Sequence, residues 1–221
     1  MVGYERSVIQ PAQKQAKTIL DDNAREYHNT HFKRMRLKCG KGALWMCETS
    51  VDMKVLLVSP LPPPKGGIAT WTERFVEYSK RNGLVCEVVN TAVTGKRAVS
   101  FSSKKELLSE TVRTLRILKK YSSKLRRFAP DVVHINTSCS PMGLMRDFLC
   151  MKMTPRNIKI VLHCHCTVED QLMGKKWGKI VFSKVVQHAD KVLVLNDASM
   201  LFVRKVTKKD AVKIPNCVSD D

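Results

Sequence analysis

Residues 54–71 read KVLLVSPLPPPKGGIATW, and this stretch decides the fold. Its first six residues, Lys54-Val55-Leu56-Leu57-Val58-Ser59, form a continuous apolar run that is typical of a strand buried on both faces in a parallel sheet. A loop rich in proline and glycine follows, and an amphipathic pattern then predicts a helix over about 68–81. The stretch therefore predicts a strand–loop–helix unit, from which α/β proteins are built.

The chain downstream repeats this alternation. Apolar segments predict further strands at about 84–91, 131–136, 158–163, 191–195 and 212–214. Helical patterns between them predict helices at about 104–128, 142–153, 175–188 and 198–206. Strands that alternate with helices are joined by right-handed crossovers. The expected fold class is therefore α/β, a doubly wound parallel sheet of Rossmann-like type.

The 52 residues before Met53 lack this alternation and show only a weak helical pattern followed by a basic segment. We expect residues 1–52 to be an N-terminal extension, weakly helical or disordered and dispensable for folding, and residues 53–221 to form the domain. No apolar run approaches the roughly 18 residues of a membrane span. The first 20 residues lack the apolar centre of a secretory signal. These features predict a cytoplasmic protein whose eight cysteines are reduced thiols.

The chain carries a formal net charge of +19, which favours an anionic partner. The excess is concentrated on the expected helix at 104–128, whose sheet-facing side is predicted to carry Leu108, Val112, Leu115, Leu118 and Leu125. Its other side carries a basic patch: Arg113, Arg116, Lys119, Lys120, Lys124, Arg126 and Arg127. A solvated helix face and an anionic membrane contact both remain open, whereas no nucleic-acid-binding motif is found.

The loop after the first strand excludes two common nucleotide sites. A dinucleotide-binding loop would read G-x-G-x-x-G, but only the adjacent pair Gly66-Gly67 is present. A P-loop ending at Gly95-Lys96 would need a glycine where Asn90 stands. Gly66 and Gly67 could expose backbone N–H groups to a phosphate, carboxylate or sugar hydroxyl, or they could serve a turn with positive φ. From the residues alone, both interpretations remain open.

Five stretches in order resemble the N-terminal domain of GT-B glycosyltransferases of the retaining, subfamily-4-like type. They are Val55 to Pro60 with Gly66-Gly67-Ile68-Ala69-Thr70-Trp71, then Pro130-Asp131-Val132-Val133-His134-Ile135-Asn136, Val161-Leu162-His163-Cys164-His165, Ala189 to Leu195, and Ile214-Pro215-Asn216. Asn136 stands where the family commonly has a second histidine, Asn196 where it often has serine, and Cys217 where a glycine is usual. The first 52 residues have no counterpart in the family. The family's second domain has no counterpart in this chain.

This resemblance implies transfer of a sugar from a nucleotide-sugar donor to a glycan or lipid-linked acceptor, in polysaccharide or glycolipid biosynthesis. It implies no cofactor and no catalytic metal. Gly66 and Gly67 would approach the donor phosphates or the transferred sugar, and His163 and His165 would hydrogen-bond the sugar or the acceptor. Asn136 and Asn196 would complete the substrate contacts. A C-terminal donor domain is expected to be absent, so that the chain alone does not turn over substrate, and peripheral attachment to the inner face of the plasma membrane is expected.

Two alternatives come from the residues themselves. The run His163-Cys164-His165-Cys166 invites a zinc site, but alternation along a strand would point the two histidines one way and the two cysteines the other. The second alternative is a non-catalytic, cationic binding module for a membrane surface or a phosphorylated ligand. Sugar-nucleotide turnover by this domain joined to a donor domain would distinguish such a module from an enzyme.

Overall fold

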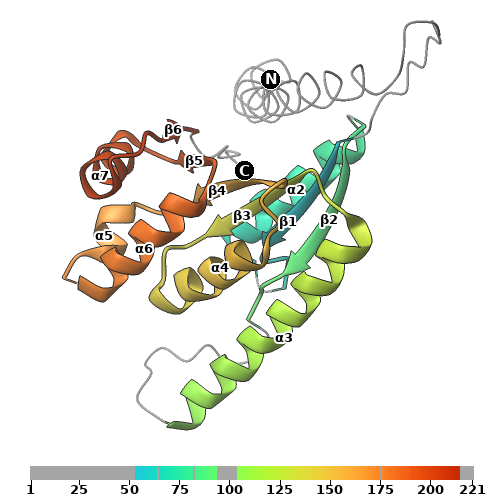
Figure 1. The fold of residues 1–221 in the computed structure, drawn as a ribbon, viewed down its shortest axis with the longest axis horizontal. Coiled ribbons are helices and arrows are strands. Elements are labelled where there is room, and N and C mark those ends of the chain that lie inside the picture. Colours follow the sequence, from blue (N-terminus) through green and yellow to red (C-terminus); the bar gives the residue numbers. More distant parts are fainter. Residues whose placement is uncertain (1–52, 64, 82, 94–103, 175, 215–221) are drawn as a thin grey trace, which may run out of the picture.

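The computed structural model describes residues 53–63, 65–81, 83–93, 104–174 and 176–214 (Figure 1). Its strands are β1 (Lys54–Ser59), β2 (Val85–Asn90), β3 (Val132–Thr137), β4 (Lys159–Cys164), β5 (Lys191–Val194) and β6 (Val212–Lys213). Its helices are α2 (Gly67–Arg81), α3 (Lys104–Phe128), α4 (Pro141–Met153), α5 (Val168–Leu172), α6 (Lys176–His188) and α7 (Asp197–Thr207). Only α5 was not expected. The expectations for residues 1–52 and for Pro215-Asn216 lie outside the described residues.

The strands form one parallel sheet in the order β2-β1-β3-β4-β5-β6, which confirms the expected fold class. The chain passes from β1 to β2 on one side and then crosses to β3 on the other. The strand order therefore reverses between β1 and β3, and ligands of open α/β sheets bind at such a switch point, beyond the carboxyl ends of the strands. The loop that contains Gly66 and Gly67 leaves β1 at this point.

Both faces of the sheet are covered, but by different helices. On one face, Leu56, Val58 and Ile135 pack with residues of α3, α4, α6 and α7 in the larger hydrophobic core. On the other face, Val55 and Leu57 pack with Phe75 of α2 in a smaller core. Successive residues of β1 thus serve opposite cores, as the continuous apolar run at 54–59 predicts.

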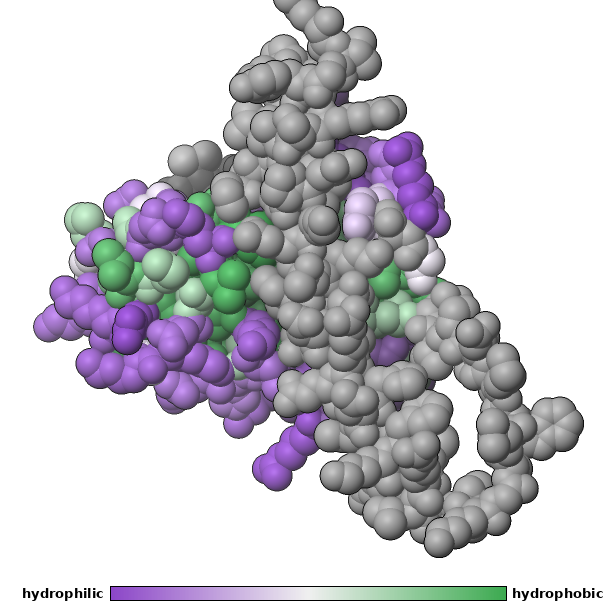
Figure 2. All heavy atoms as spheres, turned by 90° about the horizontal axis from the view of Figure 1, so that it is seen from above, coloured by the Kyte–Doolittle hydropathy of each residue, from purple (hydrophilic) through white to green (hydrophobic). Residues whose placement is uncertain are grey.

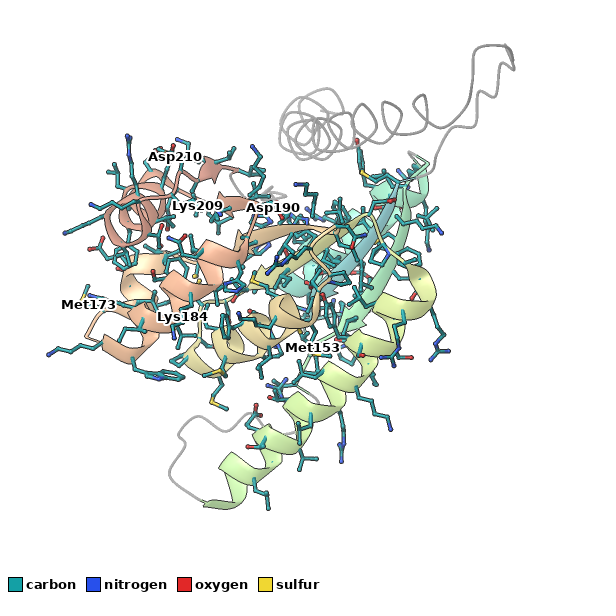
Figure 3. The ribbon with its side chains drawn as sticks, viewed as in Figure 1. Met153, Met173, Lys184, Asp190, Lys209 and Asp210 are labelled. Carbon is teal, nitrogen blue, oxygen red and sulfur yellow. The ribbon has the colours of Figure 1, made fainter. Side chains whose placement is uncertain are left out.

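Two aspartates of the resemblance motifs tie the strands together at the amino edge of the sheet. Asp131 accepts a hydrogen bond from the backbone N–H of Lys54 at 2.9 Å, and Asp190 accepts one from Ile160 at 2.8 Å. Asp190 lies close to Lys209 (Figure 3), whose ammonium group donates to the Val186 and Ala189 carbonyls. These aspartates stabilise the sheet at the edge opposite the switch point.

The sheet-facing side of α3 differs from the expectation. The buried side consists of Ile117, Tyr121 and Leu125, whereas Leu108 and Leu115 are 65% and 59% exposed, and Val112 is exposed as well. The prediction was wrong for these three residues because the N-terminal half of α3 extends past the sheet (Figure 1), where it has no core to meet. No helix within the described ranges is long and apolar enough to cross a membrane.

Candidate functional site

Gly66 and Gly67 lie at the exposed start of α2, at the carboxyl edge of the sheet. Neither has a positive φ, and a Cβ atom at either position would meet no atom of the described residues within 4 Å. The interpretation of this pair as a positive-φ turn is therefore wrong. The first turn of α2 also carries no acidic side chain. The fold itself would accept larger residues here, so a requirement for glycine has to come from whatever approaches the helix start.

The neighbouring loops are held together by Asn90, the last residue of β2. Its side-chain oxygen accepts hydrogen bonds from the backbone N–H groups of Leu61 and Ala92, at 3.0 and 2.8 Å. Arg113 of α3 donates to the carbonyl of Thr91 at 3.1 Å. The loop after β1 thus starts from a fixed base, while its glycines remain exposed.

Three histidines meet behind the start of α2, on the face of the sheet that α2 covers. His134 and His163 are buried at 1% exposure, while His165 is half-buried and follows β4 directly. The ring centroid of Trp71 in α2 lies 5.2 Å from those of His163 and His165 and 5.4 Å from that of His134. The rings of His163 and His165 lie 3.9 Å apart. Of the two histidines expected to contact substrate, His165 therefore reaches the surface, whereas His163 is buried.

The two cysteines of the same run point to the opposite face, as alternation predicts. Cys164 belongs to the larger core, and Cys166 packs against it. Within the described ranges, no group of three or more histidine, cysteine or acidic side chains is placed to hold a metal ion.

Burial keeps the inner histidines neutral. It lowers the pKa of His134 to about 3, assisted by the neighbouring His165 and opposed by the Asn136 amide. Burial also lowers the pKa of His163 well below its ordinary value, again assisted by His165. Among the described residues, no ring nitrogen of His134 or His163 has a hydrogen-bond partner. These two rings act as apolar packing against Trp71 rather than as acid–base groups.

The two expected asparagines have different surroundings. Asn136 is buried in β3, and its side-chain oxygen lies 3.1 Å from Nε2 of His165. Asn196 caps α7 by accepting from the N–H of Ser199 at 2.8 Å, and its amide nitrogen donates to Thr167. The structure thus brings Asn136 and His165 together, whereas the amide of Asn196 serves the start of a helix.

Sequence reasoning missed three residues near this edge. Trp71 covers the histidines, and the hydroxyls of Ser59 and Thr72 lie 2.5 Å apart behind them. A signal for Ser59 existed, because it is the only hydroxyl residue in the otherwise apolar run at 54–59. Nothing in the sequence indicated its contact with Thr72, which depends on how α2 crosses the sheet.

The basic patch on α3 is partly neutralised. Arg113 pairs with Glu110 and Lys124 with Glu87, at 2.6 and 2.8 Å. Arg126 and Arg127 donate to Ser122 and Ser123 one turn earlier. The remaining three cations of the patch are Arg116, Lys119 and Lys120, and none of them pairs with an acidic side chain in the part of the chain that the structure describes. Together with Ser123 they line a surface hollow of about 350 Å³.

In doubly wound α/β domains, ligands bind beyond the carboxyl ends of the strands, and at this edge the chain presents the exposed backbone of Gly66 and Gly67 and the half-buried His165. The chain belongs to Glycosyltransferase Family 4, whose family model matches residues 65–221. The match includes four of the five stretches on which the resemblance rests.

Among solved structures, the chain is similar to an alpha-glucosyltransferase in complex with UDP and a 13-mer DNA containing a central A:G mismatch, with 16% sequence identity and a TM-score of 0.41. That similarity covers 66% of this chain and 37% of the glucosyltransferase, so the chain spans little more than a third of that protein. A conserved protein from Enterococcus faecalis V583 matches with 10% identity and a TM-score of 0.28, over 74% of this chain and 91% of that one. The curated proteins include no match.

Proposed function

We propose that this chain is the acceptor-side domain of a retaining glycosyltransferase that uses a nucleotide-sugar donor and a glycan or lipid-linked acceptor. The proposal rests on family membership and on one observation, the exposed Gly66-Gly67 pair at a helix start beside His165. Among the described residues, neither backbone strain nor a steric contact explains glycine at these positions. Close approach of a ligand to the backbone does.

The start of α2 suits a negatively charged oxygen. The first N–H groups of a helix have no partner within the helix, and the helix dipole places partial positive charge there. The first turn holds no carboxylate that would compete for these donors. We assign the phosphate or sugar oxygens of the donor to the backbone at Gly66 and Gly67, and a sugar or acceptor hydroxyl to His165. His163 supports the His165 ring from behind at 3.9 Å.

Binding of UDP-glucose, UDP-N-acetylglucosamine and GDP-mannose by calorimetry tests this proposal. Gly67→Val places a branched side chain in the ligand path without a steric clash in the fold, so affinity for the accepted donor should fall at least about tenfold. Ala198→Val is the matched control, because Ala198 lies in the exposed first turn of α7. Equal loss of affinity in both variants, or no loss in Gly67→Val, would refute the assignment.

We further propose that the outer side of α3 rests on an anionic membrane, which would place the enzyme at the inner face of the plasma membrane. Arg116, Lys119 and Lys120 supply cations without acidic partners among the described residues. Leu108 and Leu115 are exposed on the same helix. Basic residues near a lipid surface contribute roughly 1 kcal/mol each, and exposed leucines add apolar area that a bilayer can bury.

The neighbouring helices of the same layer support this surface. Leu149 and Met153 of α4 and Trp177 and Ile180 of α6 are exposed, and the outer surfaces of these two helices present no acidic side chain, since Asp147 is buried. Figure 3 marks Met153 on α4 and Lys184 on α6. Figure 2, which views the molecule from above, shows hydrophobic and hydrophilic side chains side by side in the part that holds α5–α7.

Flotation with vesicles of phosphatidylcholine, with and without phosphatidylglycerol, tests the membrane contact. Binding should require the anionic lipid and weaken with salt, and it should disappear in Arg116→Glu/Lys119→Glu/Lys120→Glu. Leu108→Ser/Leu115→Ser should weaken it at every salt concentration, because it removes the apolar part. Binding that ignores lipid charge would contradict the proposal. A protein that binds anionic vesicles but no sugar nucleotide would favour the non-catalytic binding module.

A further inference from the structure

A chain of four hydrogen bonds connects the first turn of α2 with His165. Thr72 donates its hydroxyl to the carbonyl of Ile68 at 2.8 Å, and the oxygens of Thr72 and Ser59 lie 2.5 Å apart. The Asn136 amide nitrogen donates to Ser59 at 2.9 Å, and its oxygen lies 3.1 Å from Nε2 of His165. The three linking side chains are buried and come from three different elements, β1, α2 and β3.

The direction of every bond in this chain is determined. A carbonyl only accepts, so the Thr72 hydroxyl proton points to Ile68, and Thr72 must accept from Ser59. The Ser59 proton is then used, so Ser59 must accept from the amide nitrogen of Asn136. This leaves the amide oxygen of Asn136 facing His165, which must donate from Nε2. The arrangement therefore fixes both the orientation of the Asn136 amide and a proton on Nε2 of His165.

We propose that Asn136, Ser59 and Thr72 are positioning residues, which hold His165 with its Nε2 proton directed inward and fix the ring relative to the first turn of α2. This inference rests on the proposed function, which assigns one ligand contact to His165 and another to the backbone at Gly67. The chain of hydrogen bonds makes these two contact points one rigid unit. A buried chain of this kind is stronger than isolated bonds, because each bond polarises the next in a low dielectric.

The assignment gives Asn136 a different role from a direct substrate contact. Its oxygen and its nitrogen are both engaged within the protein, at 1% exposure. The side chain of Asn136 therefore does not touch the ligand but orients His165, which does. It also explains why a polar residue stands in β3, whose residues are all buried.

Proton exchange measured by NMR on the ligand-free full chain tests the inference. The Nε2 proton of His165 should exchange slowly with water and be visible near neutral pH. Thr72→Val removes the far end of the chain without touching His165, and exchange of that proton should accelerate about tenfold, the order expected for loss of a buried hydrogen bond. Thr207→Val is the matched control, because Thr207 is also a buried helical threonine that donates to the carbonyl four residues earlier.

Asn136→Asp gives a second, independent measurement. Aspartate can accept from His165 but cannot donate to Ser59, and its charge favours a doubly protonated ring. In this variant, the ¹⁵N shifts of His165 should report the doubly protonated ring up to a higher pH than in the parent protein. The inference is overturned if Thr72→Val leaves the His165 exchange rate at the level of Thr207→Val, or if Asn136→Asp leaves the His165 titration unchanged.

The same samples separate this inference from the proposed function. In the parent protein, UDP-glucose should shift the amide signal of Gly67 and the ring signals of His165 together. In Thr72→Val, UDP-glucose should still shift the Gly67 amide signal, but the shift of the His165 ring signals should be smaller. If no sugar nucleotide moves either signal, the proposed function fails, while the exchange measurements still decide the positioning role.

Discussion

Acid sensitivity should arise from the buried histidines, and His134→Leu isolates one of them. The native pKa of His134 is about 3, whereas an unfolded histidine titrates near about 6.5. Above pH 6.5, neither state binds a proton at this residue, and the group leaves stability unchanged. Between pH 6.5 and 3, only the unfolded chain binds one. The free energy of unfolding should therefore fall by about 1.4 kcal/mol per pH unit from this residue alone, or about 2 kcal/mol at pH 5.

Leucine has nearly the volume of histidine and no titrating group. It would occupy a buried site whose neighbours are Trp71 and Phe75, with ring centroids 5.4 and 5.9 Å from that of His134. At pH 7.5, we expect His134→Leu to unfold within about 1 kcal/mol of the parent, because it removes buried nitrogens without partners as well as a ring that packs well. Between pH 7.5 and pH 5, the free energy of unfolding of His134→Leu relative to that of the parent should rise by about 2 kcal/mol.

Urea unfolding followed by circular dichroism at pH 7.5, 6 and 5 measures this effect. Val133→Ile is the control, because it changes packing on the other face of β3 and leaves every titrating group in place. His163 has the same sign of shift, so some acid sensitivity should persist in His134→Leu. Equal pH dependence of the free energy of unfolding in His134→Leu and in the parent would refute the reasoning.

Two further predictions follow from single contacts, and a third follows from exposed side chains. Asp147→Ala should lower the free energy of unfolding by about 3–5 kcal/mol, because it leaves the buried Arg146 without its partner. In the parent protein, Nη2 of Arg146 lies 2.7 Å from Oδ1 of Asp147. The double variant Asp147→Ala/Arg146→Met should recover much of this loss, as urea unfolding can measure. Asp190→Ala should cost about 1–2 kcal/mol through the lost bond to the Ile160 backbone, whereas the exposed Asp210→Ala should cost less than about 0.5 kcal/mol, as thermal unfolding can measure. Charge reversal at Arg116, Lys119 and Lys120 should leave the melting temperature nearly unchanged while it abolishes flotation, because these side chains are exposed; a large loss of stability would show that they have structural contacts.

Much of the fold was predictable because its signals are local. The apolar run at 54–59 and the alternation after it gave every strand within one or two residues, and the longest helix with its bounds. The docking side of α3 was not predictable in the same way. Leu108 and Leu115 follow the helical period, but the sequence does not show that the sheet ends before they reach it.

The candidate site was predictable in its parts but not in its assembly. The glycine pair and the histidine at 165 follow from position alone, since the pair ends the loop after one strand of a parallel sheet and His165 directly follows another. That His163 is buried beneath Trp71 depends on the path of α2, and the link from Ser59 through Asn136 joins residues 77 positions apart. Such contacts follow from tertiary packing, which the pattern of one chain does not specify.

The central claim is that a sugar nucleotide binds at the carboxyl edge of the sheet, between the start of α2 and the end of β4. Amide chemical-shift mapping of the ¹⁵N-labelled protein during titration with the sugar nucleotide that it binds tests this most directly. We expect saturable shifts at Gly66, Gly67 and His165, and none at Asp131 and Asp190 on the amino edge. Shifts confined to the amino edge or to α3, with Gly66 and Gly67 unmoved at saturation, would contradict it.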